Sequence, residues 1–252
     1  MLTGKIAWIT GAGSGIGRSG ALALASAGAL VVVSGRRAEL IETVAAEIKA
    51  SGGNAEAVRL DVANRDAVAR AGTEILARHG HVDILVNSAG INVANRRWKS
   101  LVVENFDQIV ATNLNGTLYC IAAVLPAMRQ RKDGVIINVA SWAGRFSSFF
   151  VGPAYNSSKA AVIALTHSLN DEEGPNGIRA CALCPGEVAT PILAKRPVPP
   201  PPEDVARMLQ PEDLGRAIRF VAEMPPHVAI NEIVISPTWN RLLIGGEDLV
   251  RD

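Results

Sequence analysis

The sequence has no excess of charge of either sign. It contains 25 lysines and arginines against 24 aspartates and glutamates, a formal net charge of +1. Proteins that bind nucleic acid usually carry a dense basic patch, and no such run occurs here. This balance argues against a nucleic-acid partner, so we expect the partner to be a small molecule.

Long apolar runs are also missing. The first ten residues, MLTGKIAWIT, lack the apolar core of a signal peptide. Nowhere do about 18 apolar residues follow one another, the length that a membrane helix requires. We therefore expect no membrane partner and a cytoplasmic protein.

Cysteine and histidine are scarce. Three cysteines do not make a disulfide framework, and the four histidines show no metal-ligand grouping, so we predict no metal site. Cys181 and Cys184 do spell C-x-x-C. If this segment is a strand, residues three apart point to opposite faces, which prevents a shared metal or an easy disulfide. Buried structural cysteines are the favoured interpretation.

Apolar residues are abundant and follow an alternating pattern. They make up 48% of the 252 residues, enough for a substantial core. Short β-branched runs alternate with helical patterns at 16–27, 38–50 and 65–78. The predicted strands are 5–10, 30–34, 55–60, 82–87, 135–140, 178–183 and 232–235. Because the strands are almost continuously apolar and no linker interrupts the rhythm, we predict one α/β domain over residues 1–252, with a parallel sheet covered on both faces.

The only low-complexity stretch is RPVPPPPED, residues 196–204. Its prolines predict an extended, semi-rigid path. A ligand for an SH3-type partner is one interpretation, but a surface loop is favoured, and we predict a substrate lid over residues 188–210.

Two further motifs suggest chemistry. The first is the glycine-rich turn TGAGSGIG, residues 10–17, between the first strand and a helix, where close backbone approach and free N–H groups favour a phosphate. The second is YNSSK, which holds Tyr155, one of only two tyrosines. On a helix, Tyr155 and Lys159 share a face, and a cation near a phenol favours the phenolate. Either motif alone also has a purely structural explanation.

Six motifs together resemble the short-chain dehydrogenase/reductase family. They are TGxxxGxG, NSAG at 87–90, ATNLNGT at 111–117, Ser141, YxxxK and PGEVAT at 185–190, in the family's order. The resemblance implies a doubly wound Rossmann-type sheet of about seven parallel strands. It also implies an enzyme that binds NAD(H) or NADP(H) and transfers hydride at a carbonyl or alcohol carbon.

The resemblance also implies catalytic roles. Tyr155 would be the acid or base, and Lys159 would lower its pKa and bind the nicotinamide ribose. Ser141 would hold the substrate oxygen, and Asn113 would position a water for proton delivery. Structural alternatives are a helix cap for Ser141, a backbone kink for Asn113 and core packing for Tyr155.

The cofactor contacts follow from the same resemblance. Asp61 would contact the adenine unless it is only a turn residue, and Thr190 would contact the carboxamide. With Tyr155 and Lys159, the full predicted set is Gly11, Ser14, Gly15, Ile16, Gly17, Arg36, Arg37, Asp61, Val62, Asn87, Ala89, Gly90, Pro185, Gly186, Val188 and Thr190.

The end of the second strand predicts which cofactor is preferred. Members that prefer NAD usually place an acidic residue there, but this chain has Gly35, followed by Arg36 and Arg37. A guanidinium can bind the 2′-phosphate, so NADP(H) is favoured over NAD(H). The alternative is that both arginines are solvated.

The substrate is less clearly indicated. The segment 141–155 holds Trp142 and Phe149 and predicts a partly apolar cleft, although its rings could instead pack between subunits or in the core. Arg96, with its neighbour Arg97, could meet a carboxylate, but solvated loop arginines are the favoured interpretation.

The chain departs from the family pattern in two places, Ser88 in NSAG and the region after residue 235. The second departure puts substrate contacts near the C-terminus in doubt. Alternatives to a dehydrogenase are a cofactor-binding regulator without turnover and, less favoured, an enzyme acting on nucleotide sugars. The resemblance also suggests a homo-oligomer, a tetramer or a dimer.

Overall fold

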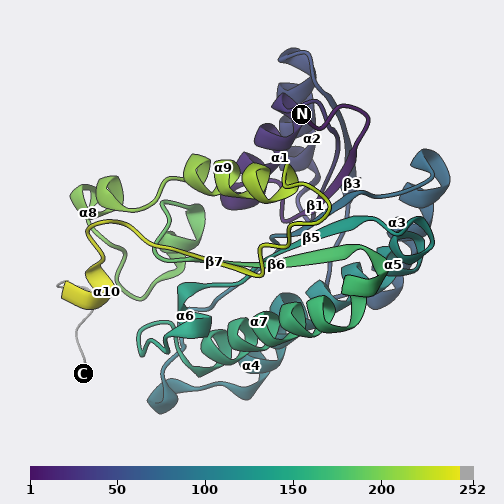
Figure 1. The fold of residues 1–252 in the computed structure, drawn as a ribbon. Helices are drawn as coiled ribbons and strands as arrows, with labels where there is room; N and C mark the ends of the chain where they lie inside the picture. Colours follow the sequence, from purple (N-terminus) through teal and green to yellow (C-terminus); the bar gives the residue numbers. More distant parts are fainter. Residues whose placement is uncertain (245–252) are drawn as a thin grey trace.

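One parallel sheet organises the molecule, for which a computed structural model describes residues 1–244 (Figure 1). Its seven strands run in the order β3-β2-β1-β4-β5-β6-β7. The strands are β1 (Ile6–Thr10), β2 (Leu30–Gly35), β3 (Asn54–Arg59), β4 (Ile84–Asn87), β5 (Gly134–Val139), β6 (Ile178–Pro185) and β7 (Glu232–Ile235). Each predicted strand is present, with its ends shifted by two residues or fewer, so the doubly wound α/β fold is confirmed.

Helices connect successive strands. They are α1 (Gly15–Ser26), α2 (Ala38–Ala50), α3 (Arg65–His79), α4 (Val103–Val110), α5 (Gly116–Arg131), α6 (Trp142–Arg145), α7 (Pro153–Glu173), α8 (Pro202–Arg207), α9 (Pro211–Ala222) and α10 (Arg241–Ile244). Short 3-10 turns are η1 (Trp98–Ser100), η3 (Gly174–Asn176) and η4 (Pro191–Lys195), and η2 (Ala111–Asn115) is a π-helical turn that joins α4 to α5. The three helices predicted from the sequence form within one residue of their expected bounds.

Alternate strand residues enter separate cores on the two faces of the sheet. Ile9 belongs to the core formed with α1, α2 and α9, whereas Trp8 belongs to the core formed with α3, α5 and α7. Figure 1 shows these two helical layers on opposite sides of the sheet. Both strand faces are therefore apolar, as a parallel sheet requires.

The C-x-x-C pair follows the same alternation on β6. Cys181 packs into the core of the α1 layer, and Cys184 packs against Val162 and Ile163 of α7 on the other face. Both cysteines are buried and free, which confirms the structural interpretation. Among residues 1–244, no cluster of three or more His, Cys, Asp or Glu side chains could hold a metal ion.

One helical run is long and apolar on average, although no 18 apolar residues follow one another in it. Val103–Arg131 is a continuous helix of 29 residues, long and apolar enough to cross a membrane by length and composition alone. Core helices of soluble proteins pass the same test. Within this run, α5 packs Cys120, Val124 and Met128 against the sheet.

The predicted lid, residues 188–210, follows β6 and closes on itself before α9. Val188 forms a parallel bridge with Leu209, so the two ends of the segment meet. The proline run is not extended throughout, because α8 begins at Pro202. Proline at the first position of a helix loses no hydrogen bond and has a suitable φ.

Trp8 provides a test of the core. Its indole is fully buried and donates a 2.8 Å hydrogen bond to Ser34 Oγ on β2. Trp8→Phe should lower the free energy of unfolding by about 1–3 kcal/mol, because the Ser34 hydroxyl loses its partner and a void remains. Urea denaturation measures this change, with the 77% exposed Trp98 as control. Trp98→Phe should alter stability by less than about 0.5 kcal/mol, and equal effects of the two changes would contradict the assigned role of Trp8.

Candidate functional site

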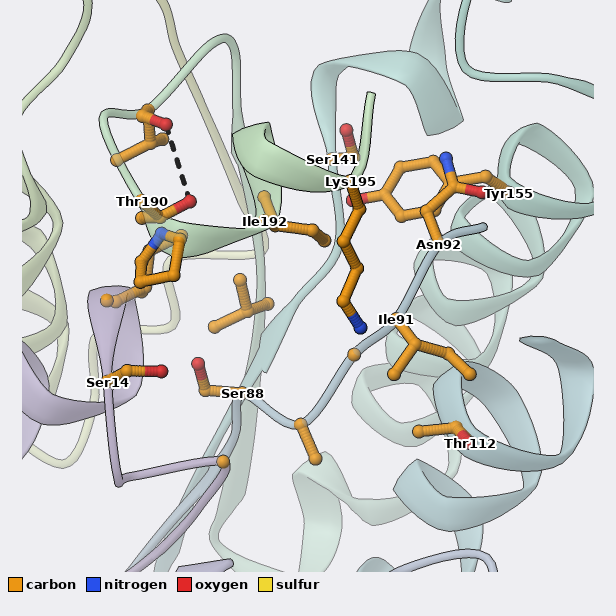
Figure 2. A pocket seen from close by; sticks show the side chains of 18 of the residues that line it. Ser14, Ser88, Ile91, Asn92, Thr112, Ser141, Tyr155, Thr190, Ile192 and Lys195 are labelled. Carbon is orange, nitrogen blue, oxygen red and sulfur yellow. Dashed lines mark hydrogen bonds between the residues drawn. The ribbon is translucent and has the colours of Figure 1, made fainter. Parts of the chain in front are cut away.

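A cavity of about 580 Å³ lies at the carboxyl ends of the strands. Its walls come from the loops that follow β1, β2, β3, β4, β5 and β6. The strand order reverses between β1 and β4, the point where open α/β sheets have a ligand-binding crevice. Figure 2 shows the side chains around this cavity.

Three glycines shape the turn after β1. Gly11 has φ +65°, and a Cβ added there would lie 2.7 Å from the Ala89 backbone. A Cβ on Gly17 would lie 2.5 Å from the Gly11 carbonyl oxygen, so Gly17 supports the turn from beneath and does not line the cavity. Gly15, at φ +55°, does line it, and its Cβ would lie 3.0 Å from Thr190 Cγ2. Because these three positions are glycine, the turn leaves an open hollow beside the backbone, which we call the cradle. Side chains at these positions would collide with the surrounding chain or occupy that space.

The amino end of α1 faces this cradle. Ser14 is the N-cap, its side chain makes no capping hydrogen bond, and the first turn of α1 has no acidic residue. The helix therefore presents N–H groups and a positive dipole end to the cavity. Arg36 and Arg37 also line it, and Arg37 donates a 3.4 Å hydrogen bond to Ser14 Oγ. These donors fit a dinucleotide pyrophosphate and a further phosphate beside it.

The remaining predicted cofactor residues fall into two groups. Asp61 lines the cavity and also accepts a hydrogen bond from the Ala63 N–H, so it serves as a turn residue as well. Asn87 does not line the cavity and donates to Asn138 Oδ1 from beneath it. The cavity is also lined by Ile16, Val62, Ala89, Gly90, Pro185, Gly186, Val188 and Thr190.

Tyr155 and Lys159 meet on one face of α7, as their spacing predicted. Lys159 Nζ lies 5.7 Å from the centre of the Tyr155 ring and donates a 2.6 Å hydrogen bond to the Val139 carbonyl at the end of β5. The ammonium is almost completely buried, and this burial lowers the pKa of Lys159 to about 8. Lys159 is thus held as a buried donor behind the tyrosine.

The Tyr155 hydroxyl lies beside Ser141 at one wall of the cavity (Figure 2). Burial raises the pKa of Tyr155, whereas the hydrogen bond with Ser141 and the charges of Arg96 and Arg196 oppose this rise. The lowering of the Tyr155 pKa by Lys159 stays a prediction, and Arg96 and Arg196 add lowering charge of their own. Ser141 also caps α6, because its Oγ accepts a 3.1 Å hydrogen bond from the Ala143 N–H.

Asn113 lies behind the cavity in the π-helical turn η2. Its Oδ1 accepts from the Ile91 N–H at 2.8 Å, and its Nδ2 donates to the Ile91 carbonyl and to Ser158 Oγ. A Cβ on Gly90 would lie 3.5 Å from Lys159 Nζ and 3.6 Å from Asn113 Oδ1, so both groups approach this glycine. The predicted water relay through Asn113 remains a prediction.

The end of the cavity near Tyr155 corrects two interpretations made from the sequence. Trp142 lines the cavity, but Phe149 does not; its ring packs against the Arg97 guanidinium, and Phe150 lines the cavity instead. Arg96 is not a solvated loop residue, because it is only 6% exposed and lines the cavity. The sequence analysis missed Asn92, Phe150, Glu187, Ile192, Lys195 and Arg196, all of which also line the cavity. For the last four, the only signal was a position in or beside the predicted lid.

Comparisons with known proteins agree with this geometry. A sequence profile of the family described as short chain dehydrogenase matches residues 5–198. An uncharacterized oxidoreductase of Staphylococcus aureus strain MW2 is 35% identical over 237 residues, which cover 94% of this chain and 99% of that protein.

Two solved structures are also similar. A metagenomic short-chain oxidoreductase in complex with NADP has a TM-score of 0.82 and 31% identity, over 95% of this chain and 99% of that one. An alcohol dehydrogenase from the archaeon Thermococcus sibiricus, complexed with 5-hydroxy-NADP, has a TM-score of 0.84 and 28% identity, over 94% and 98%.

Gly11→Ala tests the cradle, and Gly52→Ala is its matched control. Both glycines have positive φ, but a Cβ on Gly52 would meet nothing within 4 Å. Gly52→Ala should therefore cost only about 1 kcal/mol of backbone strain. Gly11→Ala should cost about 1–3 kcal/mol more, because the methyl group collides with the Ala89 backbone. Denaturation and nicotinamide-cofactor titration measure both variants, and a Gly11→Ala protein with unchanged cofactor affinity would contradict the cradle.

Proposed function

Since this chain belongs to the short-chain dehydrogenase family, we propose that it is an NADP(H)-dependent oxidoreductase that interconverts a carbonyl group and a secondary alcohol, with Tyr155 as acid and base. The observation that carries this proposal is the meeting of Ser141, Tyr155 and Lys159 at one cavity wall. The relative named an oxidoreductase and the neighbour named an alcohol dehydrogenase support the same reaction class.

In the proposed reaction, Ser141, Tyr155 and Lys159 each have a different function. A bound nicotinamide cofactor supplies or accepts the hydride. Ser141 hydrogen-bonds the substrate oxygen, and Tyr155 gives that oxygen a proton in reduction or takes one in oxidation. The hydrogen bond to the Val139 carbonyl holds Lys159 behind Tyr155, and the remaining N–H groups of the amine are available to the cavity, which Lys159 lines.

The preference for NADP(H) is supported by charge at the end of β2. Arg36 and Arg37 line the cavity there, and Gly35 replaces the carboxylate that would repel a 2′-phosphate. The NADP and 5-hydroxy-NADP complexes of the two structural neighbours point the same way.

A cofactor-binding regulator without turnover accounts for fewer of these observations than an oxidoreductase does. A regulator without turnover would not require the Ser141, Tyr155 and Lys159 arrangement, and the relative is named an oxidoreductase. We also propose that the protein is a homo-oligomer and is cytoplasmic. The proposed mechanism depends on neither property.

Tyr155→Phe tests the acid–base role. The variant should lose turnover by about 10²–10⁴-fold, because the proton donor is gone, while its affinity for NADPH stays within about twofold. The control is Tyr119→Phe, which removes the hydroxyl of the only other tyrosine, on α5 and outside the cavity. NADPH oxidation across a panel of carbonyl compounds measures turnover. Full activity in Tyr155→Phe would overturn the mechanism.

Arg36→Ala tests the cofactor preference. Loss of one charged donor to a 2′-phosphate should weaken NADPH binding about tenfold or more and leave NADH binding nearly unchanged. Nicotinamide fluorescence measures both affinities. Arg70→Ala, on the exposed surface of α3 and away from the cavity, controls for loss of positive charge. Equal effects of Arg36→Ala on the two cofactors would contradict the assignment.

A further inference from the structure

Arg96 is a buried cation without a carboxylate partner. It lines the cavity, is 6% exposed and forms no ion pair with any residue in 1–244. Its Nη2 donates a 2.7 Å hydrogen bond to the Lys195 carbonyl, but its buried Nε has no hydrogen-bond partner in the described chain. Buried guanidinium groups are normally paired, because desolvating an unpaired charge is costly.

The backbone around Arg96 holds it in place. A Cβ on Gly152, which has φ +84°, would lie 2.0 Å from the Arg96 carbonyl oxygen, so the loop before α7 packs directly on this residue. Asn92 ties the same two loops together through a 3.0 Å hydrogen bond to the Val151 carbonyl. The guanidinium is therefore carried on a segment that is fixed before any substrate enters.

The charges around Arg96 do not neutralise it. Arg196 and Arg241 share Glu187, and Arg241 also bonds to Asp204. Among the described residues, these ion pairs do not include Arg96. Burial and the nearby Arg196 lower the pKa of Arg96 to about 10, so it remains cationic near neutral pH.

Lys195 adds a second positive charge at the same end. It lies in the lid segment, lines the cavity, and forms no ion pair with the described residues. Figure 2 shows its side chain extending into the cavity, with the amine nitrogen toward Ile91. Ser141 and Tyr155 lie on the same side of the view, whereas Ser14 of the glycine turn lies across the cavity. The unmatched cations thus belong to the substrate end, and not to the phosphate cradle.

We propose that the substrate carries a carboxylate, which Arg96 binds with Lys195 while its alcohol or carbonyl carbon lies at Ser141 and Tyr155. A planar guanidinium fork matches a carboxylate better than it matches other anions. Trp142, Phe150 and Ile192 line the cavity beside these cations, so the rest of the substrate is apolar. This inference rests on the proposed oxidoreductase function for the reaction, but not for the binding of the anion.

The binding test does not require turnover. The protein saturated with NADP⁺ is titrated with benzoate, methyl benzoate and phenyl phosphate, and binding is followed by ligand-observed NMR. Benzoate should bind at least about tenfold more tightly than its neutral ester, and Arg96→Gln should remove this difference. Binding of phenyl phosphate alone, or equal binding of acid and ester, would overturn the carboxylate assignment.

Two further variants separate binding from folding. Lys195 is exposed, so Lys195→Gln should fold normally and should weaken benzoate binding to a smaller extent. Arg97→Gln is the matched control: it removes the neighbouring guanidinium, which packs on Phe149 outside the cavity and should leave benzoate affinity unchanged. If Arg97→Gln and Arg96→Gln weaken benzoate binding equally, the loss comes from a change in overall charge or in loop packing, and the proposal fails.

Turnover then distinguishes this inference from the proposed function. A series of 2-, 3- and 4-oxo acids is compared with the methyl esters, following NADPH oxidation. At least one acid should exceed its ester in kcat/KM by about tenfold or more, and Arg96→Gln should remove the preference mainly through KM. Reduction of neutral carbonyls only would overturn the carboxylate proposal and retain the oxidoreductase. Benzoate binding that depends on Arg96, with no reduction of any compound, would overturn the oxidoreductase and retain the anion site.

Discussion

The hydrogen bond from Lys159 Nζ to the Val139 carbonyl fixes the relation between α7 and the sheet. It places a buried ammonium at the carboxyl end of β5, and the helical spacing then puts Tyr155 one turn earlier, at the cavity wall. Gly144 makes room for this arrangement, because a Cβ there would lie 2.7 Å from the Lys159 carbonyl carbon. A Cβ on Gly90 would make only van der Waals contact with the amine, at 3.5 Å. The cavity wall that carries Tyr155 therefore depends on close backbone packing around a single buried cation.

The cavity has two ends of different construction. At one end, the glycine turn, the start of α1 and the exposed Arg36 and Arg37 supply backbone donors and solvated charge, which suit phosphates. At the other end, the charges are largely buried, and Arg96 is held in a loop that packs on Gly152. A charge in a low-dielectric environment acts strongly on its neighbours, and Arg96 and Arg196 influence the pKa of Tyr155 accordingly. The residues that would select the substrate thus also influence the pKa of Tyr155, the proposed acid and base.

Much of this could be predicted from sequence, because the strands are apolar runs separated by helical periods. The turn after β1 and the Tyr155–Lys159 pair follow from local spacing, which a sequence contains directly. The substrate end could not be predicted in the same way. The burial of Arg96 depends on a loop more than fifty residues away, which folds back over it. Phe150 lines the cavity in place of the predicted Phe149, because the Phe149 ring packs against Arg97. The sequence of two adjacent phenylalanines does not indicate which of the two rings makes that contact.

The most direct test of the account is a paired equilibrium titration of the unmodified protein with NADPH and NADH, following nicotinamide fluorescence. The account predicts that both nucleotides bind and that the Kd of NADPH is lower than that of NADH by a factor of about ten or more, because Arg36 and Arg37 meet the additional phosphate of NADPH. Tighter binding of NADH would contradict the assignment of the end of β2. Binding of neither would contradict the central claim that this cavity holds a nicotinamide dinucleotide.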